Sequence, residues 1–372
     1  MKLVIAMDSF KGTLTAYDAC QTVADAIAEC VPNAQFVIKP MADGGEGTAQ
    51  AMIKAANGRW IRQTVMGPLE DMQVEAGFAF FDADQSALVE MAAASGLELL
   101  GQEQMDPLKA TTYGTGQLIK AALEYGASRI LLAVGGSATV DGGLGAAAAM
   151  GWQFLNKDGE QIPLGGAGLD KLAVIVRPEN LELVPIVVLC DVDNPLCGVR
   201  GAVRIYGPQK GATPQMVETL EKGMANLAAL VNNQLGIDIN NIPGAGAAGG
   251  LAAGALAFMN GKLISGIEAV IDLSNLNREL DSADWIVTGE GSFDQQSLYG
   301  KVVSGIAKTA SQSNAHIAVL AGQVSVPQEV YQKSGITIAI GCRTENMSLD
   351  YALTNSRELL FSAAKRFAKH YL

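Results

Sequence analysis

Short apolar runs recur along the chain, and five of them end in a polar, glycine-rich loop. Continuous apolar runs are typical of strands that are buried on both faces of a sheet. In open α/β sheets the ligand binds beyond the carboxyl ends of such strands, so we expect the functional site to lie in these loops. The runs and their loops are 3–7 with 8–12, 36–38 with 43–47, 131–134 with 135–143, 186–189 with 190–194, and 285–287 with 288–294.

Both ends of the chain alternate between strand and helix patterns. Residues Thr15 to Asp18 have the spacing of a helix cap, and apolar residues then recur at helical intervals to Cys30. These patterns predict one parallel, doubly wound, Rossmann-like sheet made from the two chain ends. The further elements expected here are a strand near 36, a helix over 48–56, a strand at 285–287, a helix over 302–310, strands at 317–320 and 336–340, and a helix over 349–368.

The middle of the chain follows a different pattern. Short apolar runs at 74–81 and 87–91 flank Asp82 to Gln85, which indicates a hairpin. Further strands are expected at 130–134, 152–155, 186–189 and 203–206, so we predict a mixed sheet. We therefore expect an α/β protein of two domains, with an active-site cleft between them. The Rossmann-like domain is placed at 1–70 and 251–372, and the inserted α/β domain at 71–250.

Composition narrows the class of protein. The chain has 372 residues, of which 49% are hydrophobic, so it can bury a sizeable core and exceeds the size of a single typical domain. Its formal net charge of −12 argues against nucleic acid or an anionic membrane as the main partner. An acidic protein that binds anionic substrates needs local positive charge, from Mg²⁺ or from individual lysines and arginines.

The cysteines indicate a reducing compartment. All five are widely spaced and none forms a C-x-x-C pair, so neither a disulfide framework nor a zinc site is predicted. The chain opens with a strand pattern and its most apolar later stretch, 249–259, is short. We therefore expect no targeting or membrane-spanning segment and a cytoplasmic location.

Histidine is scarce, whereas carboxylates are plentiful. The chain has only two histidines, and one of them, His370, lies near its end. Histidine-based catalysis therefore has little material here. Carboxylates, a metal ion and glycine loops with ligand-facing N–H groups suit phosphoryl transfer, which depends mainly on positioning and charge neutralisation.

Two nucleotide-binding motifs are weak in this chain. The segment from Gly244 to Gly249 matches G-x-G-x-x-G, and Glu268 lies at a suitable distance, but a polar, proline-bearing segment precedes it instead of a buried strand. We expect this glycine segment, Gly246 included, to approach an anion or to pack against another helix. A P-loop is absent because Val302 follows Lys301, where the motif requires serine or threonine.

Two lysines and six carboxylates are candidates for binding. Lys11 lies beside Ser9 and Gly12 at an expected helix start, and Lys210 lies on a turn-rich loop. The alternative for each is an exposed lysine in a weak surface pair. The six carboxylates lie among glycines, and each alone could simply form a turn. At most two or three can ligate Mg²⁺ directly. They are Asp43, Glu46, Asp141, Asp191, Glu290 and Asp294.

Seven segments, in order along nearly the whole chain, resemble those of type I glycerate kinases. A modest departure is Met7, where many members of this family carry proline, and it changes no polar group. The segments are Asp8–Gly12, Ala42–Thr48, Gly135–Gly143, Asn194–Gly198, Gly207–Ala212, Pro243–Gly250 and Gly289–Asp294.

The resemblance implies ATP-dependent phosphorylation of D-glycerate, usually to 2-phosphoglycerate, with ATP and Mg²⁺ as cofactors. We assign Asp191 as the base or hydroxyl-orienting acid because it follows a buried strand, and Lys11 as its catalytic partner at an anionic group. Asp294 and Glu290 are expected to hold the metal or its waters. Substrate or phosphate binding is expected at Asp8, Ser9, Asp43, Gly44, Gly45, Glu46, Ser137, Thr139, Asp141, Lys210 and Gly246.

Several alternatives remain open at this point. The acceptor could be another small hydroxy acid, or the product could be 3-phosphoglycerate. More distant alternatives are an NAD-dependent hydroxy-acid dehydrogenase that uses the Gly244 segment and a metabolite-binding protein without turnover. The sequence does not decide between a monomer and a homodimer.

Overall fold

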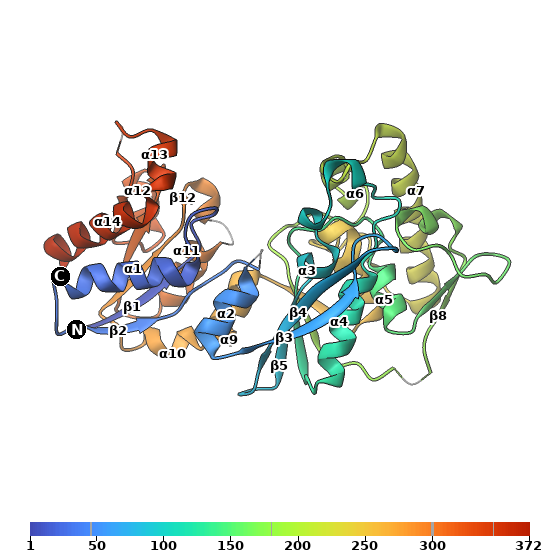
Figure 1. The fold of residues 1–372 in the computed structure, drawn as a ribbon, viewed down its shortest axis with the longest axis horizontal. Helices are drawn as coiled ribbons and strands as arrows, with labels where there is room; N and C mark the ends of the chain where they lie inside the picture. Colours follow the sequence, from blue (N-terminus) through green and yellow to red (C-terminus); the bar gives the residue numbers. More distant parts are fainter. Residues whose placement is uncertain (45–46, 180, 299–300, 345) are drawn as a thin grey trace. The chain divides into compact units, whose positions relative to one another are not determined.

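The chain forms two units, each with its own sheet and core (Figure 1). The computed structural model describes residues 1–44, 47–179, 181–298, 301–344 and 346–372. Unit 1 comprises Met1–Asp43, Gln50–Gly58 and Ser265–Leu372. Unit 2 comprises Gly44–Ala49 and Arg59–Ile264. Gly45 and Glu46, which were predicted to bind substrate or phosphate, fall outside the described residues.

Unit 1 contains a five-stranded sheet in which every pairing is parallel, in the order β15-β13-β11-β1-β2. Strand β1 is buried on both faces, because Leu3 and Ile5 pack into one hydrophobic cluster while the intervening Val4 is also fully buried. This confirms the predicted Rossmann-like sheet from both chain ends. The strands are β1 (Lys2–Met7), β2 (Gln35–Ile38), β11 (Trp285–Gly289), β13 (His316–Ala321) and β15 (Ile338–Gly341).

Helices cover the sheet of unit 1. Helices α1 (Ala16–Ala28) and α14 (Ser356–Tyr371) lie side by side on one face, where they share a core with the sheet (Figure 1). Helix α11 (Val302–Ala310) contacts β11 and α9 (Gly266–Leu273). The remaining elements of this unit are α2 (Thr48–Ala56), which continues from unit 2, α10 (Leu276–Leu280), η6 (Gln295–Leu298), α12 (Gln328–Lys333), α13 (Leu349–Thr354) and the small parallel pair β12 (Ser292–Phe293) with β14 (Gln323–Val324).

The first helix begins where the sequence predicts. Thr15 has an extended backbone, and its hydroxyl oxygen accepts a hydrogen bond from the Asp18 amide at 3.1 Å. This bond satisfies one of the amides that a helix start leaves without a partner inside the helix. The cap therefore ends the loop after β1 at a defined residue.

Unit 2 contains a six-stranded mixed sheet in the order β10-β9-β6-β5-β4-β3. Strands β5, β6, β9 and β10 are parallel, and β3-β4-β5 are antiparallel, which confirms the predicted mixed sheet and hairpin. The strands are β3 (Arg59–Met66), β4 (Gln73–Phe81), β5 (Ser86–Glu90), β6 (Arg129–Ala133), β9 (Ile186–Leu189) and β10 (Gly261–Ile264).

The helices of unit 2 complete one large hydrophobic core. Helix α7 is the longest of them; Thr213 caps its start, Pro214 occupies its first position, and Gly236 ends it with φ +73°. The other elements are α3 (Ala92–Ser95), η1 (Leu97–Leu99), η2 (Gln102–Gln104), α4 (Tyr113–Glu124), α5 (Leu144–Ala149), η3 (Gly166–Lys171), α6 (Ala202–Tyr206), η4 (Pro208–Lys210), α7 (Pro214–Leu235), η5 (Ala247–Gly250), α8 (Leu251–Phe258) and the antiparallel pair β7 (Gln153–Leu155) with β8 (Val174–Val176).

Some predicted elements differ in the structure. The strand expected at 203–206 is helix α6, because the Gly207 amide bonds to the Val203 carbonyl and closes a helical turn. The strand expected at 152–155 forms β7, but it pairs only with β8 and stays outside the mixed sheet. The predicted last helix is divided at Asn355 into α13 and α14. Strands β3 and β10 were missed, since β3 alternates exposed and half-buried residues and β10 is short.

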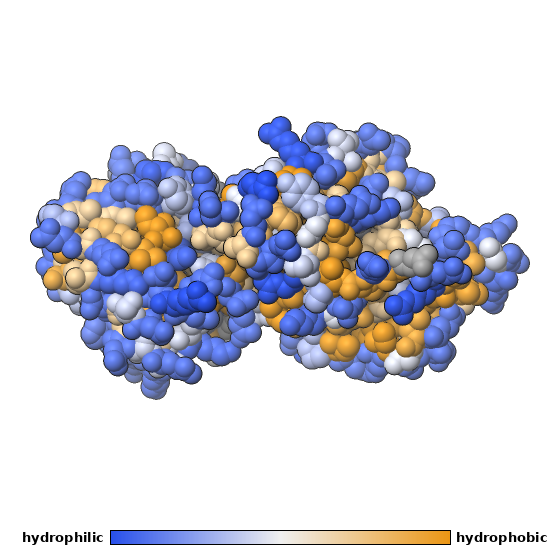
Figure 2. All heavy atoms as spheres, turned by 90° about the horizontal axis from the view of Figure 1, so that it is seen from below, coloured by the Kyte–Doolittle hydropathy of each residue, from blue (hydrophilic) through white to orange (hydrophobic). Residues whose placement is uncertain are grey.

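Hydrophilic residues cover much of the surface seen in Figure 2, with hydrophobic residues in smaller groups between them. Among the described residues, no helix combines the length and the apolar character needed to cross a membrane.

Candidate active site

Two neighbouring strands of unit 1 bring their acidic loops together. Strands β1 and β11 pair in register up to Met7 and Gly289, so Asp8 and Glu290 follow at the same edge of the sheet. The Asp8 amide donates to the Gly289 carbonyl at 2.9 Å. Residue 289 has to be glycine, because a Cβ there would lie 1.8 Å from the Leu320 carbonyl oxygen. The glycine therefore allows β11 to lie close to β13, its other neighbour in the sheet.

The carboxylate of Asp8 is destabilised by its surroundings. Burial and the neighbouring charges of Asp43 and Glu290 together raise its pKa to about 7, with burial the largest cause, while the hydrogen bond from Ser9 and the charge of Lys11 act against the rise. The Ser9 amide donates to Asp8 Oδ1 at 2.6 Å. The predicted residues Asp8, Ser9, Lys11, Asp43 and Glu290 therefore share one electrostatic neighbourhood.

The carboxylate of Glu290 is destabilised in a similar way. Its side chain is 8% exposed, and burial raises its pKa, as do the charges of Asp294 and Asp43. A hydrogen bond with Ser297 and the charge of Lys301 act in the opposite direction. Its second oxygen, Oε1, is buried and has no hydrogen-bond partner among the described residues. Such an oxygen is suited to a cation or to a donor group of a ligand.

Asp294 and Lys301 complete this cluster. Asp294 Oδ1 accepts from the Gln296 amide at 2.8 Å, while the Asp294 amide donates to the Ser297 hydroxyl at 3.1 Å. Lys301 immediately precedes α11, and it is not among the site residues predicted from the sequence, where it belongs only to the absent P-loop motif. Its signal was the lysine at an expected helix start. The structure adds what the sequence could not, namely its charge beside Glu290.

The acidic cluster fits a metal ion that arrives with phosphate. In the part of the chain that the structure describes, no three Asp, Glu, His or Cys side chains are arranged to hold an ion by themselves. Mg²⁺ commonly binds one or two carboxylates and completes its shell with waters and phosphate oxygens. The Glu290 oxygen that has no partner in the described part of the chain, and the repelling charges of Asp8 and Asp43, match that mode.

In unit 2, Asp141 is fully buried and well satisfied. Its Oδ2 accepts from the Thr112 amide at 2.8 Å and from the Thr112 hydroxyl at 2.9 Å. Its two oxygens also accept from the amides of Gly143 and Gly145 at 3.0 and 3.3 Å. Burial raises the pKa of Asp141, and these hydrogen bonds oppose the rise. Thr112 is not among the residues predicted from the sequence, because it lies 29 residues from Asp141.

Lys210 is the buried cation beside Asp141. It is 2% exposed, and its ammonium donates to the Ser137 hydroxyl at 2.7 Å and to the Thr139 carbonyl at 2.8 Å. Burial lowers its pKa to about 7, and the charge of Asp141 opposes this effect. The exposed-lysine alternative is therefore wrong for Lys210. The Thr139 hydroxyl is buried without a hydrogen-bond partner among the described residues.

The glycine segment at 244–250 packs against neighbouring loops. The Gly246 amide donates to the Asn194 carbonyl at 3.0 Å, and a Cβ at Gly249 would lie 1.9 Å from the Thr139 carbonyl oxygen. Residues 236–239 are irregular and 240–243 form bends and a turn, so the strand that a dinucleotide motif needs does not precede it. Packing is thus the observed use of this segment.

Asp191 and Gly44 lie where their loops were expected. Asp191 is exposed and is the second residue after β9; its neighbour Cys190 donates its amide to the Ile264 carbonyl at 2.9 Å. Gly44 follows Asp43 with φ +88°, a conformation that favours glycine.

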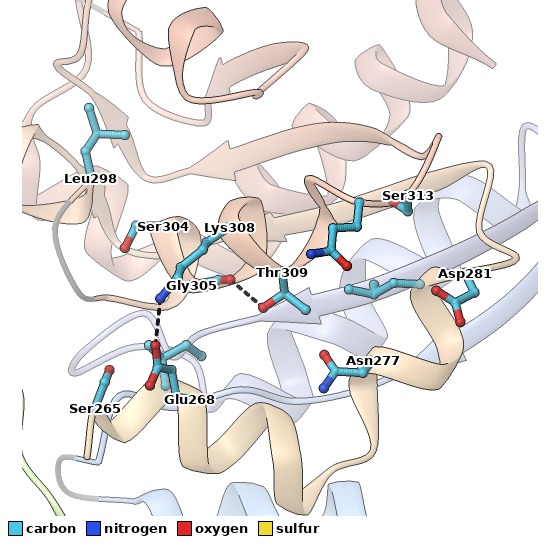
Figure 3. A pocket seen from close by; sticks show the side chains of 13 residues that line it. Ser265, Glu268, Asn277, Asp281, Leu298, Ser304, Gly305, Lys308, Thr309 and Ser313 are labelled. Atoms are coloured by element: carbon cyan, nitrogen blue, oxygen red, sulfur yellow. Dashed lines mark hydrogen bonds and ion pairs between the residues drawn. The ribbon is translucent and has the colours of Figure 1, made fainter. Parts of the chain in front are cut away.

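A pocket of about 750 Å³ lies elsewhere in unit 1, beside α9, α10 and α11 (Figure 3). Glu268 and Lys308 face one another across part of it, with 2.8 Å between Oε1 and Nζ, and Asn277 and Ser304 also contribute to its lining. The residues that line this pocket include none of the predicted site residues. The candidate site is therefore defined by the loops at the strand ends and not by this pocket.

The parallel sheet with acidic loops beyond its strand ends places the chain among α/β proteins. The sequence profile of the glycerate kinase family matches residues 3–372. The chain therefore belongs to the glycerate kinase family, a family of phosphotransferases.

Individual relatives agree with this assignment. The chain is 43% identical to a glycerate kinase of Halalkalibacterium halodurans, over 98% of this chain and 97% of that protein. It is 40% identical to the glycerate 2-kinase of Escherichia coli K12, over 99% and 97%. The crystal structure of a presumed glycerate kinase 2 from Salmonella typhimurium LT2 matches with a TM-score of 0.90 at 40% identity, covering 99% of this chain and 97% of that one.

Proposed function

We propose that this kinase transfers the γ-phosphoryl group of ATP to a hydroxyl of D-glycerate and forms 2-phosphoglycerate, with Mg²⁺ on the phosphates. The substrate and product are proposed from the Escherichia coli relative named glycerate 2-kinase. The observation that carries the chemistry is the cluster of Asp8, Asp43 and Glu290, in which burial raises the pKa values of Asp8 and Glu290 and the charges of neighbouring carboxylates add to the rise. Such a cluster is stabilised when positive charge is brought to it.

In unit 1, Glu290 and Asp294 would hold the metal or its waters. Bound Mg²⁺ would neutralise charge on the phosphate oxygens. Lys11 would contact a phosphate group, since it lies on the tight turn that joins Phe10 to Leu14 through mutual backbone hydrogen bonds. Asp8 and Asp43 would orient the waters or hydroxyls of the bound groups.

In unit 2, Asp191 would accept the proton from the attacking hydroxyl. The hydroxyl oxygen forms a bond to the γ-phosphorus, the bond from that phosphorus to the bridging oxygen breaks, and ADP leaves with the electron pair. The exposure of Asp191 beyond a buried strand supports this role. The loop that carries Ser137 and Thr139 would contact an anionic group of a substrate.

An ADP-release assay over a panel of small hydroxy acids tests the proposal, followed by phosphorus NMR of the product. D-Glycerate should give the highest kcat/KM and a phosphate on the 2-hydroxyl. Release of ADP with a different acid only, or a phosphate on the 3-hydroxyl, would replace the proposed substrate or product.

Replacement of Asp191 and of Asp294 by asparagine, one at a time, tests the roles assigned to them. Asp191→Asn should lower kcat by at least about a hundredfold, because a general base commonly contributes that much or more. If Asp191→Asn kept near-normal kcat while Asp294→Asn abolished it, the two roles would have to be exchanged.

We place the enzyme in the cytoplasm because all five cysteines are free thiols, as expected in a reducing compartment. Light scattering of the purified chain would decide between a monomer and a homodimer.

A further inference from the structure

Lys210 is a buried lysine whose hydrogen bonds converge on one loop. Its ammonium donates to the Ser137 hydroxyl and to the Thr139 carbonyl, both in the loop that follows β6. Lys210 is 2% exposed, so protein covers almost all of its surface. Lys210 can act on a ligand through a residue that it touches.

Ser137 is that residue. A serine hydroxyl has one hydrogen to donate and two lone pairs, whereas an ammonium can only donate. The Ser137 oxygen therefore accepts from Lys210, and its own hydrogen must lie in another direction. Among the described residues, no hydrogen bond donated by the Ser137 hydroxyl is found, and the residue is half-buried beside exposed Gly136.

The loop around Ser137 is held from its other side as well. Ser137 forms an isolated antiparallel bridge with Gly96, the Ala138 amide donates to the Ser95 carbonyl at 2.9 Å, and the Leu97 amide donates to the Gly136 carbonyl at 2.8 Å. A donor that is held on both sides is preorganised, and this strengthens its interaction with a charged acceptor.

We propose that Lys210 is a positioning residue that directs the Ser137 hydroxyl hydrogen toward an anionic oxygen of a bound substrate. The oxygen belongs to a carboxylate or to a phosphate, which share the chemistry of a charged acceptor. This inference rests on the proposed function for its choice of substrates, D-glycerate and ATP.

The test is a double-mutant cycle with Ser137→Ala and Lys210→Met. Each single change should raise the KM of the same substrate at least about tenfold, as expected for loss of a hydrogen bond to a charged group. A rise for D-glycerate identifies the carboxylate, and a rise for ATP identifies a phosphate. The double variant should lie within about threefold of the weaker-binding single variant, because both changes remove the same interaction.

Matched variants separate positioning from stability. Ser137→Thr keeps a hydroxyl and should restore most of the affinity. Ser128→Ala removes another serine hydroxyl of unit 2, one that donates to the carbonyls of Asp84 and Gln85, and should leave both KM values within about twofold. If Ser137→Ala left both KM values within twofold, or if the two single effects multiplied in the double variant, the proposal would be overturned.

Direct binding distinguishes this proposal from the proposed function. Dissociation constants for D-glycerate, ATP and inorganic phosphate can be measured by calorimetry without turnover. If the wild-type protein shows no kinase activity with D-glycerate but Ser137→Ala and Lys210→Met weaken binding of one of these probes together, the positioning role stands and the proposed function fails. If the kinase is active and neither variant weakens any probe, only the positioning role fails.

Discussion

The acidic loops of the two units contain the same residue types, but their carboxylates have different roles. In unit 1, Asp8 and Glu290 repel one another, and Glu290 keeps a buried oxygen without a partner among the described residues. In unit 2, the buried carboxylate of Asp141 accepts hydrogen bonds from amides and hydroxyls and lies near the Lys210 ammonium. An aspartate in a glycine loop is thus an incomplete binding group in one unit and an internal support in the other.

The largest effect on stability should follow Asp141→Ala. The change leaves the amides of Thr112, Gly143 and Gly145 without their acceptor and Lys210 without its counter-charge. Breaking a buried charged network costs about 3–5 kcal/mol. A loss of 3 kcal/mol corresponds to a Tm lower by roughly 6–12 °C for a unit of this size.

Asp82→Ala is the control for this prediction. Asp82 pairs with Arg59 at the surface, where it is 62% exposed, so its loss should cost less than about 1 kcal/mol. Calorimetric unfolding of both variants makes the comparison. Equal and small losses of Tm would contradict the supporting role of Asp141.

Glu290→Gln should lower the activity without lowering the stability. We expect kcat/KM to fall at least about a hundredfold, or ~2.7 kcal/mol of transition-state stabilisation. The Tm should stay the same or rise, because the change removes repulsion with Asp8 and Asp43. Steady-state kinetics and thermal unfolding check both parts.

Glu268→Gln is the matched control for Glu290→Gln. Glu268 is 55% exposed and pairs with Lys308 at the pocket of unit 1. Its kcat/KM should stay within about twofold of the wild type. If kcat/KM of Glu290→Gln stayed as close to the wild type as that of this control, Glu290 would not belong to the active site.

Lys11→Met should have an intermediate effect. Loss of one cation from the phosphate should lower kcat/KM for ATP at least about tenfold, or ~1.4 kcal/mol. Lys308→Met, which breaks only the exposed pair with Glu268, serves as control. If Lys11→Met lowered kcat/KM by less than tenfold, Lys11 would be an ordinary surface lysine and not a phosphate-binding residue.

The smallest expected effect is a pH dependence of stability from Asp8. Its pKa lies at about 7 in the folded chain and at 3.8 for an ordinary aspartate. Between these values the folded chain keeps a proton on Asp8 that the unfolded chain has released. The free energy of unfolding that this proton contributes is therefore lost as the pH rises from about 4 to 7. Asp8→Asn should remove at least about 1 kcal/mol of this dependence. Thermal unfolding of both proteins from pH 4.5 to 7.5, without metal or nucleotide, gives the two slopes, and equal slopes would refute the assignment.

Local patterns predicted much of the fold because they depend on near neighbours. The cap at Thr15 and the hairpin around 82–85 follow from residues a few positions apart, and both appear in the structure. The prediction of a strand at 203–206 was wrong because a short apolar pattern such as Val203 and Ile205 fits a strand or a helix equally well. The segment is helix α6, which is flanked by glycines at both ends. Strand β3 has no apolar run, and its pairing with β4 places it in the sheet.

The sequence by itself determined the family, the parallel strands of unit 1 and the residue types in the acidic loops, because seven ordered segments and buried apolar runs are local properties of the chain. Only the tertiary structure decided which of these charges are satisfied. Asp141 meets Thr112 from a segment 29 residues away, and Asp8 meets Glu290 across a strand pairing of the two chain ends. Burial and the distance between charges set a pKa and a hydrogen bond, and neither exists until distant segments pack together.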